Sequence, residues 1–257
     1  ISLGLPDSLL GAGWPVMQSQ LDVPVSFAGI LTMIIALGTV VSSLFSDTLT
    51  RKFGAGKVTA VSVLMTALAL LGFSFSSEFW MLVLWAIPYG LGAGAVDAAL
   101  NNYVALHYAA RHMSWLHCFW GIGASISPYI MSFALSGGYG WHSGYQIVGI
   151  LQLALTVLLF VTLPLWKKVR PPKKQAEIQA AKENPPDSQE KHSSLLTTLK
   201  TAGVIPMLIA FCSYSAVEQT SMLWASSYLV QQRSIAAETA AGFASLFFLG
   251  ITLGRLL

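Results

Sequence analysis

An acidic residue lies inside one of the long apolar runs of this sequence. Asp97 belongs to the run 79–103, which is long enough to cross a lipid bilayer as a helix. A charge at the centre of such a helix costs about 2.5–3.5 kcal/mol on insertion scales, so acids in these positions usually line a polar path or site. Gly90 and Gly94 lie four residues apart and allow a neighbouring helix to approach closely. We expect Asp97 to face a polar cavity.

Two other acids, Asp7 and Glu218, lie in apolar runs and are candidates for similar chemistry. A carboxylic acid in a medium of low dielectric constant can take up a proton on one side of a membrane and release it on the other. We predict that Asp7 and Asp97 couple proton movement, and that Glu218 and its neighbour Gln219 bind a solute. The alternative is that these acids are structural and are hydrogen-bonded to neighbouring helices.

Further candidate solute ligands in the apolar runs are Asn101, Asn102, His117, Trp14 and Trp224. Consecutive residues of a helix face about 100° apart, so only one of the two asparagines need line a cavity. His117 could relay a proton or bind the solute, although a single histidine near a helix end is more often a packing residue. Trp14, Trp120 and Trp224 could stack on a sugar ring, although tryptophans in membrane proteins more often pack or lie at the interface.

Composition assigns the chain to the membrane proteins. Of its 257 residues, 54% are hydrophobic and only 10% are charged, and the mean hydropathy is +0.64; a soluble domain carries about 25% charged residues. The net charge of +3 does not indicate nucleic acid, because the basic residues are concentrated between apolar runs. Cys118 and Cys212 are too few and too scattered for a metal site or a disulfide framework. No metalloprotease, nucleophile or phosphate-loop motif occurs, so we predict neither an enzyme nor a bound cofactor.

Eight apolar runs divide the chain. Their approximate limits are 1–20, 25–46, 58–77, 79–104, 114–136, 145–166, 203–230 and 239–257. They predict an all-α polytopic membrane protein with eight helices, the first and last of them clipped. Because the sequence begins without methionine and ends inside an apolar run, we expect a fragment of a longer chain.

Basic residues predict the orientation in the membrane. Twelve of the fourteen lysines and arginines lie on one side if the connection between the second and third runs is cytoplasmic. The positive-inside rule then places the N-terminus and the long central connection in the cytoplasm. That connection, residues 167–202, has paired prolines and mixed charges and is expected to be a solvated linker. It separates a six-helix bundle, residues 1–166, from the start of a second bundle, residues 203–257.

An internal repeat supports this division. Asp7 matches Glu218 at an offset of 211 residues, and Ala28-Gly29 matches Ala241-Gly242 at an offset of 213 residues. Two six-helix bundles repeated in the same sense occur in large transporters, which bind their substrate between the bundles. We expect a pseudo-twofold arrangement in which the second bundle is truncated.

The connection 47–57 resembles a motif of the major facilitator superfamily. In that family the connection between helices 2 and 3 reads Gly-x-x-x-Asp-Arg-x-Gly-Arg-Arg and braces the two halves of the protein as they rock. Asp47, Arg51, Gly54 and Lys57 match it with wider spacing. We expect Arg51 or Lys57 to pair with Asp47, because an acid at a helix C-terminus is unfavourable unless it is paired. Gly54 would permit a tight turn.

Four other stretches resemble the fucose permease-like branch of that family, the sugar:proton symporters. They are residues 4–15, 90–101, 116–128 and 214–224. The resemblance implies that carboxylates in helices 1 and 4 are the proton and sugar sites, and Asp7 and Asp97 occupy those positions. In the fucose permease the helix 4 acid is a glutamate and no acid matches Glu218, so its substrate specificity is not implied.

Together these features predict a twelve-helix major facilitator transporter of the cell membrane, of which this chain is the first two-thirds. We expect proton-coupled symport of a small polar solute, such as a monosaccharide, by alternating access. Its partners would be the solute, protons and the lipid bilayer, and the protein would be a monomer. Two alternatives stay open: a proton-coupled exporter of drugs or metabolites that works by antiport, and a non-transporting receptor built on the same fold.

Overall fold

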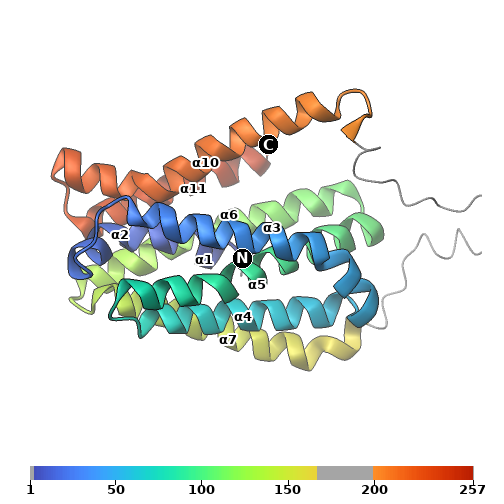
Figure 1. The fold of residues 1–257 in the computed structure, drawn as a ribbon, viewed down its shortest axis with the longest axis horizontal. Helices are drawn as coiled ribbons and strands as arrows, with labels where there is room; N and C mark the ends of the chain where they lie inside the picture. The colour runs from blue at the N-terminus through green and yellow to red at the C-terminus, as the bar shows by residue number, and fades with distance from the viewer. Residues whose placement is uncertain (1–2, 167–198, 257) are drawn as a thin grey trace, which may run out of the picture.

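The computed structural model describes residues 3–166 and 199–256, and nearly all of them form helices (Figure 1). The helices are α1 (Gly4–Asp7), α2 (Leu9–Gln20), α3 (Phe27–Phe53), α4 (Ala55–Ser74), α5 (Phe79–His107), α6 (Ala110–Ser136), α7 (Gly140–Trp166), α10 (Val204–Arg233) and α11 (Ala237–Leu256). They run side by side along one long axis (Figure 1). Of the predicted linker, residues 167–198 lie outside the described residues.

Six of the described helices, α3 to α7 and α11, are long and apolar enough to cross a membrane. Two of the eight predicted spans therefore do not qualify by length and composition. The first is divided at Ser8 into α1 and α2, and α2 has only 12 residues. The other is α10, which has 30 residues but carries Glu218 and Gln219 near its centre. Polar residues lower the hydropathy of both segments.

A one-residue turn at Gly54 joins α3 to α4. Gly54 has a φ angle of +86°, which residues with a side chain rarely adopt. The turn was predicted, but the connection 47–57 is shorter than expected because α3 continues to Phe53. Asp47 and Arg51 form an ion pair of 2.9 Å across one turn of α3, and such a pair stabilises the end of the helix.

Small residues allow α3 and α5 to pack at close range. A side chain added at Gly90 or Gly94 would collide with the backbone oxygen of Ile35 or Thr39. The hydroxyl groups of Thr39 and Ser43 donate hydrogen bonds to the carbonyl oxygens of Gly90 (3.3 Å) and Gly94 (3.2 Å). The predicted close-packing face of α5 is confirmed. Because both helices are locked at several points, the contact also fixes which residues of α5 face the interior.

Close contacts also bring α10 and α11 against the first helices. A side chain at Gly11 of α2 would collide with the backbone oxygen of Met222 in α10. A side chain at Gly121 of α6 would meet the hydroxyl group of Thr252 in α11. Segments on the two sides of the central linker therefore share one interface, and Figure 1 shows α10 and α11 alongside the other helices.

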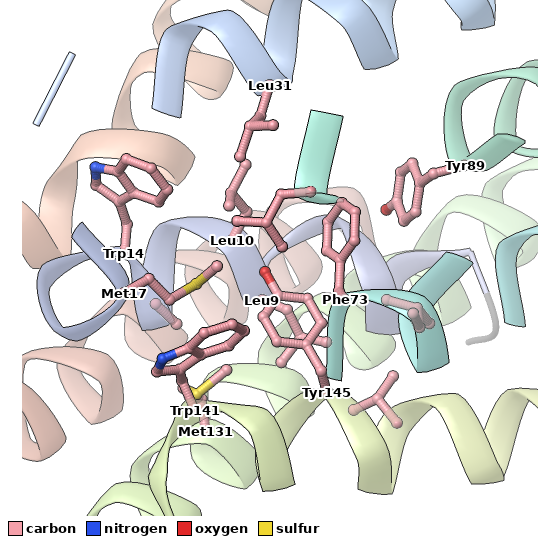
Figure 2. Packing of buried hydrophobic residues seen from close by; sticks show 14 of the residues in the cluster. Leu9, Leu10, Trp14, Met17, Leu31, Phe73, Tyr89, Met131, Trp141 and Tyr145 are labelled. Atoms are coloured by element: carbon pink, nitrogen blue, oxygen red, sulfur yellow. The ribbon is translucent and has the colours of Figure 1, made fainter. Parts of the chain in front are cut away.

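A cluster of large buried side chains lies among the helices (Figure 2). It includes Leu9, Leu10, Trp14, Met17, Leu31, Phe73, Tyr89, Met131, Trp141 and Tyr145. The outward faces are apolar as well: the side chains of Met33 and Val161 are 67% and 71% exposed. Helices that are apolar on all sides are typical of membrane spans, because lipid surrounds them.

We predict that Gly94→Ala destabilises the protein. The added methyl group would overlap the backbone oxygen of Thr39 and the hydroxyl group of Ser42, and overpacking of this kind costs about 1–3 kcal/mol. Thermal unfolding in detergent should show a melting temperature lower by roughly 2–10 °C. Gly29→Ala in α3 is the control, because no atom lies within 4 Å of that position. Equal melting temperatures for the two variants would contradict the proposed role of the α3–α5 contact.

Candidate functional site

A cavity of about 680 Å³ opens between the helices. Its volume is within the range of small-molecule sites, about 300–1,000 Å³. The acidic, imidazole, amide, indole and phenol side chains on its walls belong to Asp7, Tyr89, Asp97, His117, Trp120, Tyr145, Glu218 and Gln219. Five residues predicted as site residues are thus brought together from α1, α5, α6 and α10: the three acids, the histidine and the glutamine.

Asp7 accepts a hydrogen bond at each of its carboxylate oxygens. Tyr89 Oη donates to Oδ1 at 3.1 Å, and Trp120 Nε1 donates to Oδ2 at 2.9 Å. Tyr89 belongs to α5 and Trp120 to α6, so this carboxylate joins three helices. The hydroxyl group of the next residue, Ser8, donates to the backbone oxygen of Ala124 in α6 at 2.8 Å. Hydrogen bonds of Asp7 and Ser8 therefore fix the chain where α1 ends and α2 begins, and they hold Asp7 in one orientation.

The carboxylates of Asp97 and Glu218 lie on the same cavity wall as that of Asp7. Asp97 and Glu218 both lie close enough to Asp7 to interact with it electrostatically. Like charges repel more strongly in a low-dielectric interior than in water. The cavity wall therefore favours a proton, a cation or a neutral solute over an anion. Among the described residues, no group of three or more histidines, cysteines and acids is arranged to hold a metal ion.

Asp97 has two polar neighbours. Asn101 lies one turn further along α5 and forms a hydrogen bond with the carboxylate of Asp97, and His117 of α6 interacts with it electrostatically. Asn101 is not itself part of the cavity wall, and Asn102 is exposed away from it. Neither of the two asparagines predicted as solute ligands is part of the described cavity wall: Asn101 lies beside Asp97, and Asn102 points in another direction because adjacent residues of a helix face about 100° apart.

Trp14 and Trp224 are absent from the cavity wall among the described residues. Trp14 is fully buried, and its indole nitrogen donates to the backbone oxygen of Val25 at 2.8 Å. Trp224 is half-buried and packs against the same core. Their predicted stacking on a solute is not supported, because packing occupies their rings. Trp120 is the tryptophan that the structure places on the wall.

Sequence reasoning missed two tyrosines that line the cavity, Tyr89 and Tyr145. Tyr89, Ala93 and Asp97 follow one another at intervals of four residues and share one face of α5, and all three line the cavity. This spacing is a signal that could have identified Tyr89. Tyr145 lies in the apolar sequence of α7, where no such pattern marks it.

The predicted loop residues form the exposed end of the α3–α4 hairpin. The ion pair of Asp47 and Arg51 is open to the surroundings, with side chains 61% and 57% exposed. Of the two predicted partners of Asp47, Arg51 is the one that pairs, and Lys57 is exposed. None of these residues, nor Gly54, is part of the described cavity wall.

Membrane-length helices around a cavity that carries several polar side chains on a largely apolar wall define a multi-pass membrane protein. The chain belongs to the Major Facilitator Superfamily, whose family model matches residues 1–257. The superfamily to which the 47–57 connection pointed is thereby confirmed, together with the all-helical membrane fold.

Individual relatives are distant. The chain is 21% identical over 273 residues to Bypass of stop codon protein 6 of Saccharomyces cerevisiae, across 100% of this chain and 54% of that protein. It is 29% identical over 167 residues to the 4-hydroxybenzoate transporter PcaK of Acinetobacter baylyi, across 63% of this chain and 35% of that protein. It is 25% identical over 154 residues to a D-xylose transporter of Levilactobacillus brevis, across 58% and 34%. The chain thus spans about half the length of the first relative and about a third of the other two.

We predict that Tyr89→Phe destabilises the protein by removing one of the two donors to Asp7. Hydrogen bonds to charged groups contribute about 1.5–3 kcal/mol, so the melting temperature in detergent should fall by roughly 3–10 °C. Tyr129→Phe on α6 is the matched control, because its side chain is 52% exposed. If Tyr89→Phe and the control have the same melting temperature, the hydrogen bond from Tyr89 does not hold Asp7 in place.

Proposed function

We propose that the protein is a secondary active transporter that moves a small, neutral, hydroxylated solute together with a proton by alternating access. A monosaccharide is the representative solute. The observation that carries the proposal is the Asp7 carboxylate, which two donors hold on the wall of a solute-sized cavity beside two further acids. Placement in the sugar:proton symporter branch is part of the same proposal.

The proton would act on the charge of the cavity. A proton bound to Asp7 or Asp97 removes one of the like charges that face one another, so the loaded carrier would reorient with less buried charge. Protonation also turns a carboxylate oxygen from an acceptor into a donor. Tyr89 and Trp120 both donate to Asp7, so the protonation state of Asp7 would be linked to the hydrogen bonding of α5 and α6.

The charges on the cavity wall support the proposal that the solute is neutral. The described lining residues include three acids and no lysine or arginine. An organic anion such as 4-hydroxybenzoate, the compound in the name of one relative, would meet repulsion there. D-xylose, in the name of another relative, carries no charge and offers several hydroxyl groups to the polar side chains. We therefore take D-xylose as the first probe.

The organisation of the whole transporter is part of the proposal. Residues 1–166 would form a six-helix bundle, 167–202 a cytoplasmic linker, and 203–257 the start of a second bundle of a longer chain. Support comes from the relatives' length and from the repeated acids Asp7 and Glu218, which lie on the same cavity. The protein would act as a monomer in the cell membrane, with its N-terminus in the cytoplasm.

Proton coupling is tested with the full-length protein in proteoliposomes under an imposed pH gradient. We expect Asp7→Asn and Asp97→Asn each to abolish gradient-driven accumulation of D-xylose. An amide mimics the protonated acid but cannot release a proton, so exchange of labelled for unlabelled solute should continue. Retained exchange is the control for folding and binding.

The sign of the gradient distinguishes the alternatives. Accumulation driven by a proton gradient running in the same direction as the solute supports symport, and accumulation driven by the opposite gradient would identify an antiporter. If gradient-driven accumulation survives in the double variant, these acids do not couple protons to transport. No binding or flux with any solute of a broad panel would favour a receptor.

We also propose that Asp47, Arg51, Gly54 and Lys57 act as a gating connection. Exposed ion pairs contribute only about 0–1 kcal/mol to stability, so removal of the pair of Asp47 and Arg51 should leave the fold intact and reveal its effect on transport. Arg51→Gln should shift the melting temperature by no more than about 2–4 °C but lower the rate of solute exchange. Lys52→Gln is the control, because Lys52 lies over the ring of Phe53 in the same turn. Equal exchange rates for both variants would remove the gating role.

A further inference from the structure

The hydroxyl group of Tyr145 has no hydrogen-bond partner among the described residues. Its side chain is 1% exposed, and its Oη atom is buried. The residue nevertheless lines the cavity that contains Asp7. Buried hydroxyl groups are nearly always hydrogen-bonded, because an unsatisfied one has lost its water without replacement. Tyr145 therefore differs from Tyr89, whose hydroxyl group donates to Asp7.

Neighbouring aromatic rings fix the ring of Tyr145. It meets Phe73 edge-on, with ring centroids 5.4 Å apart, and Trp141 edge-on at 5.9 Å. Trp141 is itself held by a hydrogen bond of 2.7 Å from its Nε1 atom to Gln20 Oε1. These contacts hold the ring in one orientation, and the hydroxyl group therefore has a defined position.

Phe73 lies between the two tyrosines of the cavity (Figure 2). Its ring is nearly parallel to that of Tyr89, with centroids 6.3 Å apart and an interplanar angle of 10°, and it meets Tyr145 edge-on. Asp7, Tyr89 and Tyr145 thus all lie on the wall of one cavity, with the ring of Phe73 between the two tyrosines.

We propose that the Tyr145 hydroxyl group binds the transported solute by a hydrogen bond to one of the solute's own hydroxyl groups, in the cavity that also contains Asp7. The proposal rests on the transport function proposed above and adds α7 to the helices that contact the solute. A hydroxylated solute fits because a phenol can both donate and accept a hydrogen bond. A neutral solute would also avoid electrostatic repulsion from the acidic side chains on the same wall.

The first test compares the full-length wild-type protein with Tyr145→Phe, and D-xylose is the probe. Loss of one hydrogen bond should raise the dissociation constant, measured by titration calorimetry, about 3- to 10-fold. The melting temperature without solute should stay the same or rise, because the variant removes an unsatisfied hydroxyl group. A purely structural tyrosine would change stability and leave affinity unchanged. Tyr129→Phe, at an exposed position, should change neither.

Monodeoxy analogues of D-xylose locate the contact. Each analogue lacks one hydroxyl group. The analogue without the hydroxyl group that pairs with Tyr145 cannot form this hydrogen bond even with the wild-type protein. That analogue should bind wild type and Tyr145→Phe with dissociation constants within about twofold of each other. If Tyr145→Phe weakens every analogue as much as it weakens D-xylose, the assigned hydrogen bond is wrong.

A second variant separates this proposal from the transport function. Tyr145→Cys is made together with Cys212→Ser and treated with methyl methanethiosulfonate, and the buried native Cys118 is the internal control. We expect modification at residue 145, because loss of the tyrosine ring opens this position to the cavity, and none at Cys118, which is not part of the described cavity wall. Failure to modify residue 145, or an unchanged affinity of Tyr145→Phe for D-xylose, overturns the proposal. The protein could also be modified at residue 145 and yet bind no neutral sugar. That result would show that residue 145 lines the cavity, and it would reject the proposed solute class.

Discussion

The need to hold a carboxylate inside an apolar bundle organises much of this structure. An acid among membrane helices is costly unless it has partners, and Asp7 has two, one from α5 and one from α6. Tyr89 and Trp120 must both be placed accurately for these hydrogen bonds to form, and different helix contacts position them. The α3–α5 contact fixes the rotation of α5 and so the direction of Tyr89. The hydrogen bond from Ser8 to Ala124 fixes α1 on α6. The site and the packing of the bundle are therefore one arrangement.

Membrane helices also explain why small and hydroxylated residues carry the packing. Lipid gives no hydrophobic drive for one helix to join another, so close approach and hydrogen bonds take its place. Gly90 and Gly94 allow the approach, and Thr39 and Ser43 supply the hydrogen bonds. Gln152 and Thr66, which connect α7 to α4 by a hydrogen bond of 3.4 Å, extend the same principle to another helix pair. Polar contacts lie inside this bundle, and apolar faces lie outside.

The sequence predicted the features that an apolar background makes visible. Asp7, Asp97 and Glu218 stand out because charge is rare in such runs, and the four-residue glycine spacing marks a close helix contact. Gly54 was identified because a tight turn between two long helices needs a positive φ angle. Tyr145 could not be found in this way, because a tyrosine in an apolar run looks the same whether it packs, lies at the interface or faces a cavity. Its place depends on tertiary contacts with Phe73 and Trp141.

The two acids matched by the internal repeat, Asp7 and Glu218, have different surroundings. Asp7 lies at a break between two short helices and is held by two donors, whereas Glu218 lies within the continuous helix α10 beside the exposed Gln219. The two carboxylates nevertheless interact electrostatically. A change of charge at one of them therefore alters the energy of the other. Since α1 and α10 lie on opposite sides of the linker, this repulsion connects the two parts of the chain through the cavity itself.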